Sequence, residues 1–248
     1  ALLVPRTPTH IMYSDASYGG LGGWSPDLKF AWRVMHDDLK RMGFRLRPPT
    51  LNSINDGLDD NNHLHINPLE FLAVLVNIWI SWYCIRTAST SVLGGYVLRA
   101  MADNTTAISW LRHAATTDNA VIRHWARLAS AMLAKLSSHN TVLDIQHIQG
   151  TQNTGADLLS RLENGLVPTL ESCIDKCSAL KETRIFLLPS RLFYILAERD
   201  SSLSTEGLCE EAMTELSIVE PIIMRDGWTR NELRSTLVET CQTRTQSS

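Results

Sequence analysis

The sequence predicts an α/β protein organised around a mixed sheet. Two observations lead to this class. Residues 11–34 hold three short apolar segments separated by turn residues, and the chain from residue 68 to 162 alternates between helical periodicity and short apolar strands. The expected order is three strands, a helix, a strand, two helices, a strand and a helix. This order gives a five-stranded mixed sheet flanked by helices.

The three N-terminal strands are expected at 11–16, from residue 22 onward, and at 28–34. The first of them ends before a cluster of glycines, which predicts a tight reversal where positive φ is needed: Gly19, Gly20, Gly22 and Gly23. Pro26 and Asp27 supply the next turn signal. The three segments are therefore expected to form an antiparallel meander.

Residues 36–62 interrupt this pattern. They are polar and contain Pro48-Pro49 and Asp56-Gly57, so we expect an exposed insertion. A helical period then begins at Pro68, a residue that the first turn of a helix tolerates. The apolar residues that follow have the spacing of an amphipathic helix: Leu69, Leu72, Ala73, Val76, Ile80 and Tyr83.

Strands and helices alternate in the next part of the chain. Val97–Ala102 is a predicted strand that ends at Asp103, and two helices follow, through residues 107–114 and 121–136. Residues 141–148 alternate between apolar and polar side chains, which is typical of a half-buried strand. A final helix is expected to run through residues 156–162.

Length and charge indicate a division of the chain. At 248 residues it exceeds a typical domain of about 150 residues. The net charge of −3 divides into +2 for residues 1–162 and −5 for residues 163–248. We therefore predict a domain over 1–162, followed by an acidic, mostly helical tail or connector over 163–248. Thr229 and Glu232 have capping-box spacing within that tail.

Composition excludes several classes of protein. A chain with 44% hydrophobic and 20% charged residues is neither disordered, collagen-like nor a coiled coil. Five scattered cysteines favour a reducing, intracellular compartment, either cytoplasm or nucleus. Residues 71–85 form an uncharged run shorter than the roughly 20 residues of a membrane span, so no membrane helix is expected. The N-terminus lacks an initiator methionine and a signal pattern, and we interpret the chain as a piece of a longer one.

Four acidic residues lie among core residues at the ends of predicted elements: Asp15, Glu70, Asp103 and Asp157. Burying several carboxylates close together is costly, because desolvation and mutual repulsion both disfavour their charged forms. A divalent cation removes this cost, and oxygen ligands suit Mg²⁺ or Mn²⁺. Glu70 and Asp157, each in a helix's first turn, could instead simply interact with the helix dipole.

Four motifs carry a family resemblance, and the last of them is the most specific. YSDASYGGLGGW (13–24), INPLEFLAV (66–74), ADNTTAISWL (102–111) and HIQGTQNTGADLLSR (147–161) resemble, in order, the motifs of the ribonuclease H domain of retroelement reverse transcriptases. The fourth is similar to the ending found in LTR-type and DIRS-like retrotransposons. The resemblance covers residues 10–162 and implies a ribonuclease H-like fold for that part of the chain.

The resemblance also implies roles for individual residues. Asp15 would bridge two metal ions, Glu70 and Asp103 would complete one metal site, and Asp157 would hold the other ion. His147 matches a mobile histidine that assists proton transfer or product release, although it could be an ordinary loop histidine. Asn67 matches a position that contacts nucleic acid, although it could also be a cap or turn residue ahead of the helix.

These implications define the expected function. The chain would be an endonuclease that hydrolyses the RNA strand of RNA:DNA hybrids with two Mg²⁺ ions, for which Mn²⁺ could substitute. Its partners would be the hybrid and an upstream reverse transcriptase polymerase domain of the same polyprotein. Two alternatives stay open: another nuclease of the same fold, such as an integrase or junction resolvase, or an inactive module that binds nucleic acid or supports a polymerase.

Overall fold

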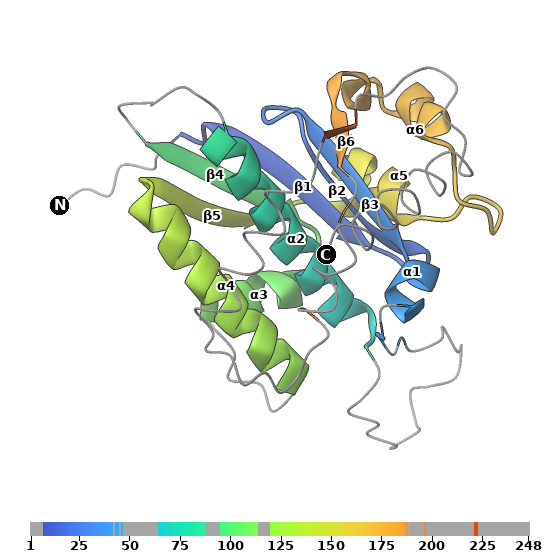
Figure 1. The fold of residues 1–248 in the computed structure, drawn as a ribbon. Coiled ribbons are helices and arrows are strands. Elements are labelled where there is room, and N and C mark those ends of the chain that lie inside the picture. Colours follow the sequence, from blue (N-terminus) through green and yellow to red (C-terminus); the bar gives the residue numbers. More distant parts are fainter. Residues whose placement is uncertain are drawn as a thin grey trace, which may run out of the picture.

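One mixed sheet organises the protein (Figure 1). The computed structural model describes residues 7–41, 43–44, 46, 64–87, 95–113, 120–186, 188, 196 and 221–222. The strands are β1 (His10–Ala16), β2 (Gly20–Ser25), β3 (Phe30–Met35), β4 (Tyr96–Ala102), β5 (Thr141–His147), β6 (Arg184–Phe186) and β7 (Pro221–Ile222). They lie in the order β5-β4-β1-β2-β3-β6-β7.

The directions of the strands confirm the mixed sheet. The strands β1, β2 and β3 form the expected antiparallel meander, while β4 runs parallel to β1 and β5 runs parallel to β4. At the other edge, β6 runs parallel to β3 and β7 is antiparallel to β6. Because β1 and β4 are parallel neighbours, their C-terminal ends meet at the same edge of the sheet.

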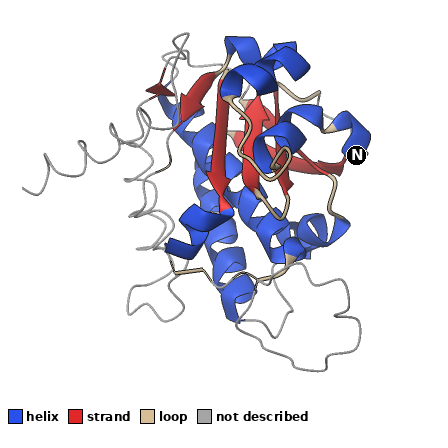
Figure 2. Cartoon of the chain, turned by 90° about the vertical axis from the view of Figure 1, so that its right-hand side faces the viewer, coloured by secondary structure: helices blue, strands red, loops and turns tan. Residues whose placement is uncertain are grey.

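Helices cover both faces of the sheet (Figures 1 and 2). On one face lie α2 (Ile66–Thr87), α3 (Thr105–His113) and α4 (Ala120–Ser138), with the short α1 (His36–Arg41) following β3. On the opposite face lie α5 (Thr154–Ser160) and α6 (Leu170–Lys176). Two short 3-10 helices, η1 (Gly150–Gln152) and η2 (Ser178–Glu182), precede α5 and follow α6.

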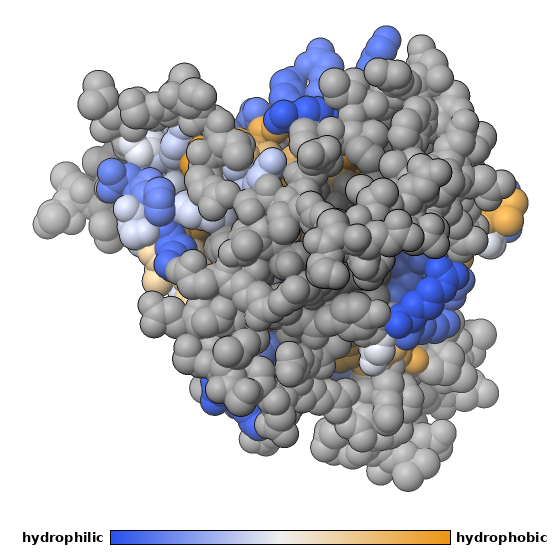
Figure 3. All heavy atoms as spheres, in the orientation of Figure 1, coloured by the Kyte–Doolittle hydropathy of each residue, from blue (hydrophilic) through white to orange (hydrophobic). Residues whose placement is uncertain are grey.

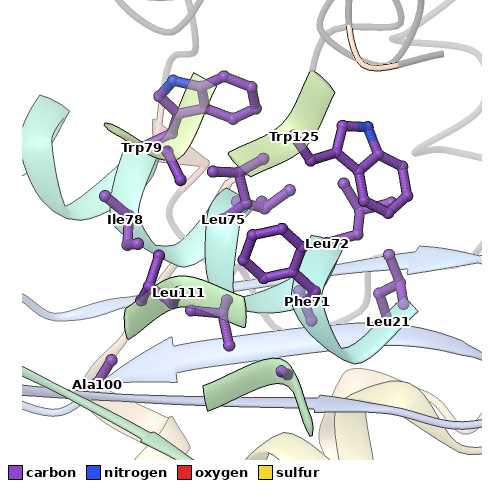
Figure 4. Close-up of a cluster of buried hydrophobic side chains, with 14 of the residues drawn as sticks. Leu21, Phe71, Leu72, Leu75, Ile78, Trp79, Ala100, Leu111 and Trp125 are labelled. Atoms are coloured by element: carbon purple, nitrogen blue, oxygen red, sulfur yellow. The ribbon is translucent and has the colours of Figure 1, made fainter. Parts of the chain in front are cut away.

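The main core lies between the sheet and the first group of helices. Trp79 and Phe71 from α2 meet Trp125 from α4 there, with Leu111 from α3 and Ala100 from β4 beside them (Figure 4). In the face shown in Figure 3, most of the described residues visible at the surface are hydrophilic and the hydrophobic areas are small. Among the described residues, the large apolar side chains therefore lie mostly in this interior.

Helix α2 is the central element of this core and differs from the amphipathic helix that the spacing predicted. It begins two residues earlier, at Ile66, and is buried on nearly all sides, because the sheet lies on one side and α3 and α4 on the other. Its segment from Ile66 to Ile85 is long and apolar enough to cross a membrane. Nearly all of this segment is nevertheless buried inside the protein. A helix that is apolar all round is typical of a core position.

The five predicted strands are present, but the count of five is wrong because the C-terminal extension adds two more. The strand β6 is only three residues long and pairs with β3 through Phe30, Ala31 and Trp32. Its Ile185 joins Cys173 of α6 and Leu180 of η2 in a second apolar cluster, which covers Trp24 and Ala31. The extension as far as residue 186 therefore continues the same sheet, and its described part combines short helices with strands.

The predicted insertion also begins differently from the sequence expectation. Residues 36–41 form α1, and the side chains of Leu39 and Phe44 are buried in the main core, where the Phe44 ring contacts that of Trp125. These two apolar side chains attach the start of the segment to the core, so its described residues 36–41 and 43–44 are not simply an exposed insertion. Residues 47–63, like the predicted helix start at 229–232, lie outside the described residues.

The glycines after β1, of which Gly20, Gly22 and Gly23 belong to β2 itself, serve a different purpose from the one predicted. The tight turn exists, with the Ser17 N–H donating to the Gly20 carbonyl over 2.9 Å. Positive φ angles, however, occur at glycines 43, 95 and 165 among the described residues and not at 19–23. At Gly22 a Cβ atom would lie 2.6 Å from the Cβ of Leu159, so the missing side chain lets α5 approach β2 closely. This close approach fixes the position of α5 against the sheet and therefore the position of Asp157, which lies in α5.

Candidate metal centre

Three of the four predicted acids converge. Asp15 lies one residue before the end of β1, Asp103 directly follows β4, and Glu70 is in the second turn of α2. The pairing of Tyr13 with Met101, continued by two residues, places Asp15 opposite Asp103. Each acid offers a carboxylate oxygen, and these oxygens all lie within 4.8 Å of one another. Residues distant in sequence thus meet at one edge of the sheet.

Burial makes this cluster electrostatically unfavourable without a cation. Asp15 and Glu70 are each only 4% exposed. Burial, reinforced by the charges of Asp15 and Asp103, raises the pKa of Glu70 to about 9. Burial likewise raises the pKa of Asp15 to about 7, against the lowering effect of a hydrogen bond from the Ser160 hydroxyl. Both groups are therefore held well above the usual range of a carboxylic acid.

Glu70 supplies an independent indication that these residues fit a cation. Its carboxylate accepts a hydrogen bond from the backbone N–H of Ala16, but its Oε2 atom is buried and has no hydrogen-bond partner. An unpartnered buried carboxylate oxygen is costly, because it has lost its water without gaining a donor. A cation among the three carboxylates would satisfy it. The buried triad of Asp15, Glu70 and Asp103, which we call the acidic triad, could hold a metal ion.

Asp157 lies beside the triad rather than within it. It lies three residues before Ser160, whose hydroxyl donates to Asp15, and its charge contributes to the raised pKa of Asp15. Asp157 Oδ1 is 2.5 Å from the Nε atom of Arg161, four residues later in the chain. Burial raises the pKa of Asp157, Arg161 opposes this, and Asp103 adds to it. The structure thus brings the fourth acid near the other three but pairs it with a cation of its own.

Helix α5 is attached to β1 by polar contacts on both sides of Asp157. The Asn153 Nδ2 atom donates to the Ser14 carbonyl over 2.9 Å, just before the helix begins. The Ser160 hydroxyl donates to Asp15 Oδ2 over 2.5 Å, at the last residue of the helix. These two bonds hold the helix, and with it Asp157, against the strand that carries Asp15.

The other two predicted site residues, His147 and Asn67, lie close to elements of the triad. His147 ends β5, is paired in register with Ala102, and is exposed, so it lies one strand away from Asp103 at the same edge. Asn67 lies in the first turn of α2, where its Oδ1 atom accepts a hydrogen bond of 2.9 Å from Asn104 Nδ2. The side chain of Asn67 thus links the start of α2 to the residue after Asp103.

Sequence reasoning missed three residues that shape the site. Asn104 caps α3, accepting from the Ala107 N–H over 3.0 Å, and its spacing before the helix was a usable signal. Ser160 orients Asp15, which no local pattern would reveal because 145 residues separate them. At Gly150 a Cβ atom would lie 3.1 Å from Asp103 Oδ2, so the loop after β5 passes close to the triad.

No family model, curated protein or solved structure matches this chain.

Proposed function

We propose that the chain is a metal-dependent nuclease of the ribonuclease H type, which hydrolyses the RNA strand of an RNA:DNA hybrid and leaves 3′-hydroxyl and 5′-phosphate ends. The observation that carries this proposal is the acidic triad: three carboxylates from three separate elements, with oxygens within 4.8 Å of one another and one oxygen unpartnered. The choice of an RNA:DNA hybrid as the substrate rests on the motif resemblance of residues 10–162.

The donor set fits hard divalent cations. Carboxylate oxygens are the ligands that Mg²⁺ and Mn²⁺ prefer in proteins. The raised pKa values of Asp15 and Glu70 show that their charged forms are disfavoured here, and a bound cation would stabilise those forms. The triad would hold one ion, and Asp15 together with Asp157 would hold a second. Such a pair would supply the activation of a water molecule and the stabilisation of the leaving oxygen of a phosphodiester.

The chain's own side chains orient these ligands and the substrate. The Ser160 hydroxyl donates to Asp15 Oδ2 and so fixes the orientation of this carboxylate beside Glu70 and Asp103. His147 is exposed at the same edge, where its imidazole can exchange a proton with the reaction products or with solvent. Asn67, held by Asn104, presents an amide near Glu70 that can donate to the nucleic acid.

The substrate and partners follow from the same proposal. RNA is distinguished from DNA through its 2′-hydroxyl groups, so the RNA strand would be the one that is cut. An upstream polymerase domain in the same polyprotein would deliver the hybrid. A nuclease of this kind needs no nucleophile from the protein, since the attacking group is water.

Cleavage of a labelled RNA:DNA hybrid in Mg²⁺ tests the proposal. We expect Asp15→Asn and Asp103→Asn to reduce the rate on the order of 10³-fold, because each removes a charged ligand worth several kcal/mol in the transition state. The control is Asp38→Asn, which removes an exposed carboxylate from α1 and should leave the rate unchanged.

Full activity of Asp103→Asn would refute the proposal. Parallel substrates separate the alternatives: preferential cutting of duplex DNA or of a junction would indicate another nuclease of this fold. Binding of hybrid and of Mn²⁺ without any cleavage would indicate an inactive module.

A further inference from the structure

Arg161 gives the two halves of the site different charge environments. It directly follows α5, its side chain is 65% exposed, and its Nε atom lies 2.5 Å from Asp157 Oδ1. Asp157 itself is 29% exposed in its side chain. The fourth acid therefore has a resident cation, whereas Glu70 in the triad retains an unpartnered Oε2 atom.

The influence of Arg161 extends from Asp157 to Asp15. Its charge lowers the pKa of both carboxylates, against the raising effect of their burial. Because the guanidinium pairs with Asp157 Oδ1, it takes up a carboxylate oxygen that a second divalent ion shared by Asp15 and Asp157 would need. Two cations cannot occupy that position together, because they repel each other at short distance.

We propose that Arg161 is a resident counter-cation that a second divalent ion must displace from Asp157, so that ions load in a fixed order. The first ion binds at the acidic triad, and the second binds at Asp15 and Asp157 after the guanidinium has moved away. This inference rests on the proposed function. Arg161 acts through Asp157 and is therefore a positioning residue.

The exposure of Arg161 makes this exchange feasible. An exposed ion pair is weak, since water screens it and two long side chains must be held in one geometry. Once displaced, the guanidinium returns to solvent without leaving a buried charge behind. Arg161 therefore opposes the second ion without preventing its binding, and removing its charge should tighten that ion's binding by about three- to tenfold.

Titration calorimetry with Mn²⁺ alone tests the loading order. In the full chain we expect a tighter and a weaker binding event, and Asp157→Asn should remove the weaker one. Arg161→Gln should tighten the weaker event by roughly three- to tenfold and leave the tighter event unchanged. Arg161→Lys, which keeps the positive charge, should stay closer to the unmodified chain.

Arg41→Gln is the matched control, because Arg41 also pairs with an aspartate of its own helix, Asp38, and its side chain is 61% exposed. Circular dichroism of each variant checks that the fold is retained. An unchanged or weakened second event in Arg161→Gln would overturn the inference while leaving the metal centre intact. Absence of any Mn²⁺ binding to the unmodified chain would instead overturn the proposed function itself.

Discussion

Glu70 shows how the surroundings of one side chain decide its chemistry. In the sequence it is an acid near the start of a helix, a position usually explained by the helix dipole. In the structure it is almost fully buried beside two other acids, and burial raises its pKa to about 9. Its position could be predicted from the motif, but its unpartnered Oε2 atom depends on how β1 and β4 close around it.

The raised pKa of Glu70 predicts a pH-dependent stability of the metal-free protein. The folded state keeps a proton on Glu70 at pH values where the unfolded chain has lost it. The resulting contribution to stability is complete below the ordinary pKa of 4.5 and is lost as the pH rises to about 9. The melting temperature in a chelator should therefore fall between these pH values, with Asp15 adding to the slope up to about pH 7.

Thermal unfolding across this pH range measures the effect. Glu70→Gln removes the titrating group and should make the slope shallower, whereas Glu171→Gln, an exposed acid on α6, should not. Saturating Mg²⁺ should raise the melting temperature most at high pH, because the ion binds the deprotonated carboxylates. Equal slopes for Glu70→Gln and the unmodified chain would contradict this prediction.

Among the elements, α5 depends most on a feature that the sequence hides. Its helical residues were predictable from the motif around Asp157. Its close packing against β2, however, depends on the absence of a side chain at Gly22. The Cβ position of Gly22 lies 2.6 Å from Leu159 Cβ and 2.8 Å from the Ser160 backbone nitrogen. The sequence around Gly22 indicates a turn. The close approach of this glycine to α5 involves residues nearly 140 positions later in the chain, which a local pattern does not reveal.

Gly22→Ala should therefore displace α5. We expect a loss of about 1–3 kcal/mol in the free energy of unfolding, as for other overpacked contacts. Binding of Mn²⁺ at the triad should persist, while the second ion, which needs Asp157, should bind more weakly.

Denaturant unfolding and calorimetry measure the two effects of this substitution. The control is Gly43→Asn: a Cβ at Gly43 meets nothing within 4 Å, so this substitution measures only the cost of placing a side chain at a φ of 91° and should leave the binding of both ions unchanged. An unchanged unfolding free energy for Gly22→Ala would show that the helix does not rely on this approach.

At the scale of the whole molecule, the pattern of strands and helices in residues 10–162 was largely predictable, because hydrophobic periodicity is a local property. The far edge of the sheet was not. The strand β6 has only three residues, which carry no periodicity, and it forms because β3 offers an unpaired edge. Similarly, α2 lost its expected polar face because α3 and α4 enclose it, a tertiary effect absent from the local pattern.

Truncation measures the contribution of the extension. A chain ending at residue 162 loses Ile185, Cys173 and Leu180 from the second apolar cluster, which exposes Trp24 and Ala31. We expect its melting temperature to fall by roughly 10 °C relative to a chain ending at residue 196, since several large apolar contacts disappear. The longer chain retains the hydrogen bond of 2.7 Å from Trp125 Nε1 to the Leu196 carbonyl. Equal melting temperatures would support an independent domain over 1–162.

The late position of β6 has a consequence for synthesis. All four acids precede residue 158, whereas the strand that pairs with β3 ends at residue 186. A growing chain therefore leaves the ribosome with its carboxylates already translated and with one side of β3 still lacking a neighbour. An unpaired strand edge is a template for pairing with another chain, so we expect β3 to be a site of aggregation during synthesis until β6 is complete.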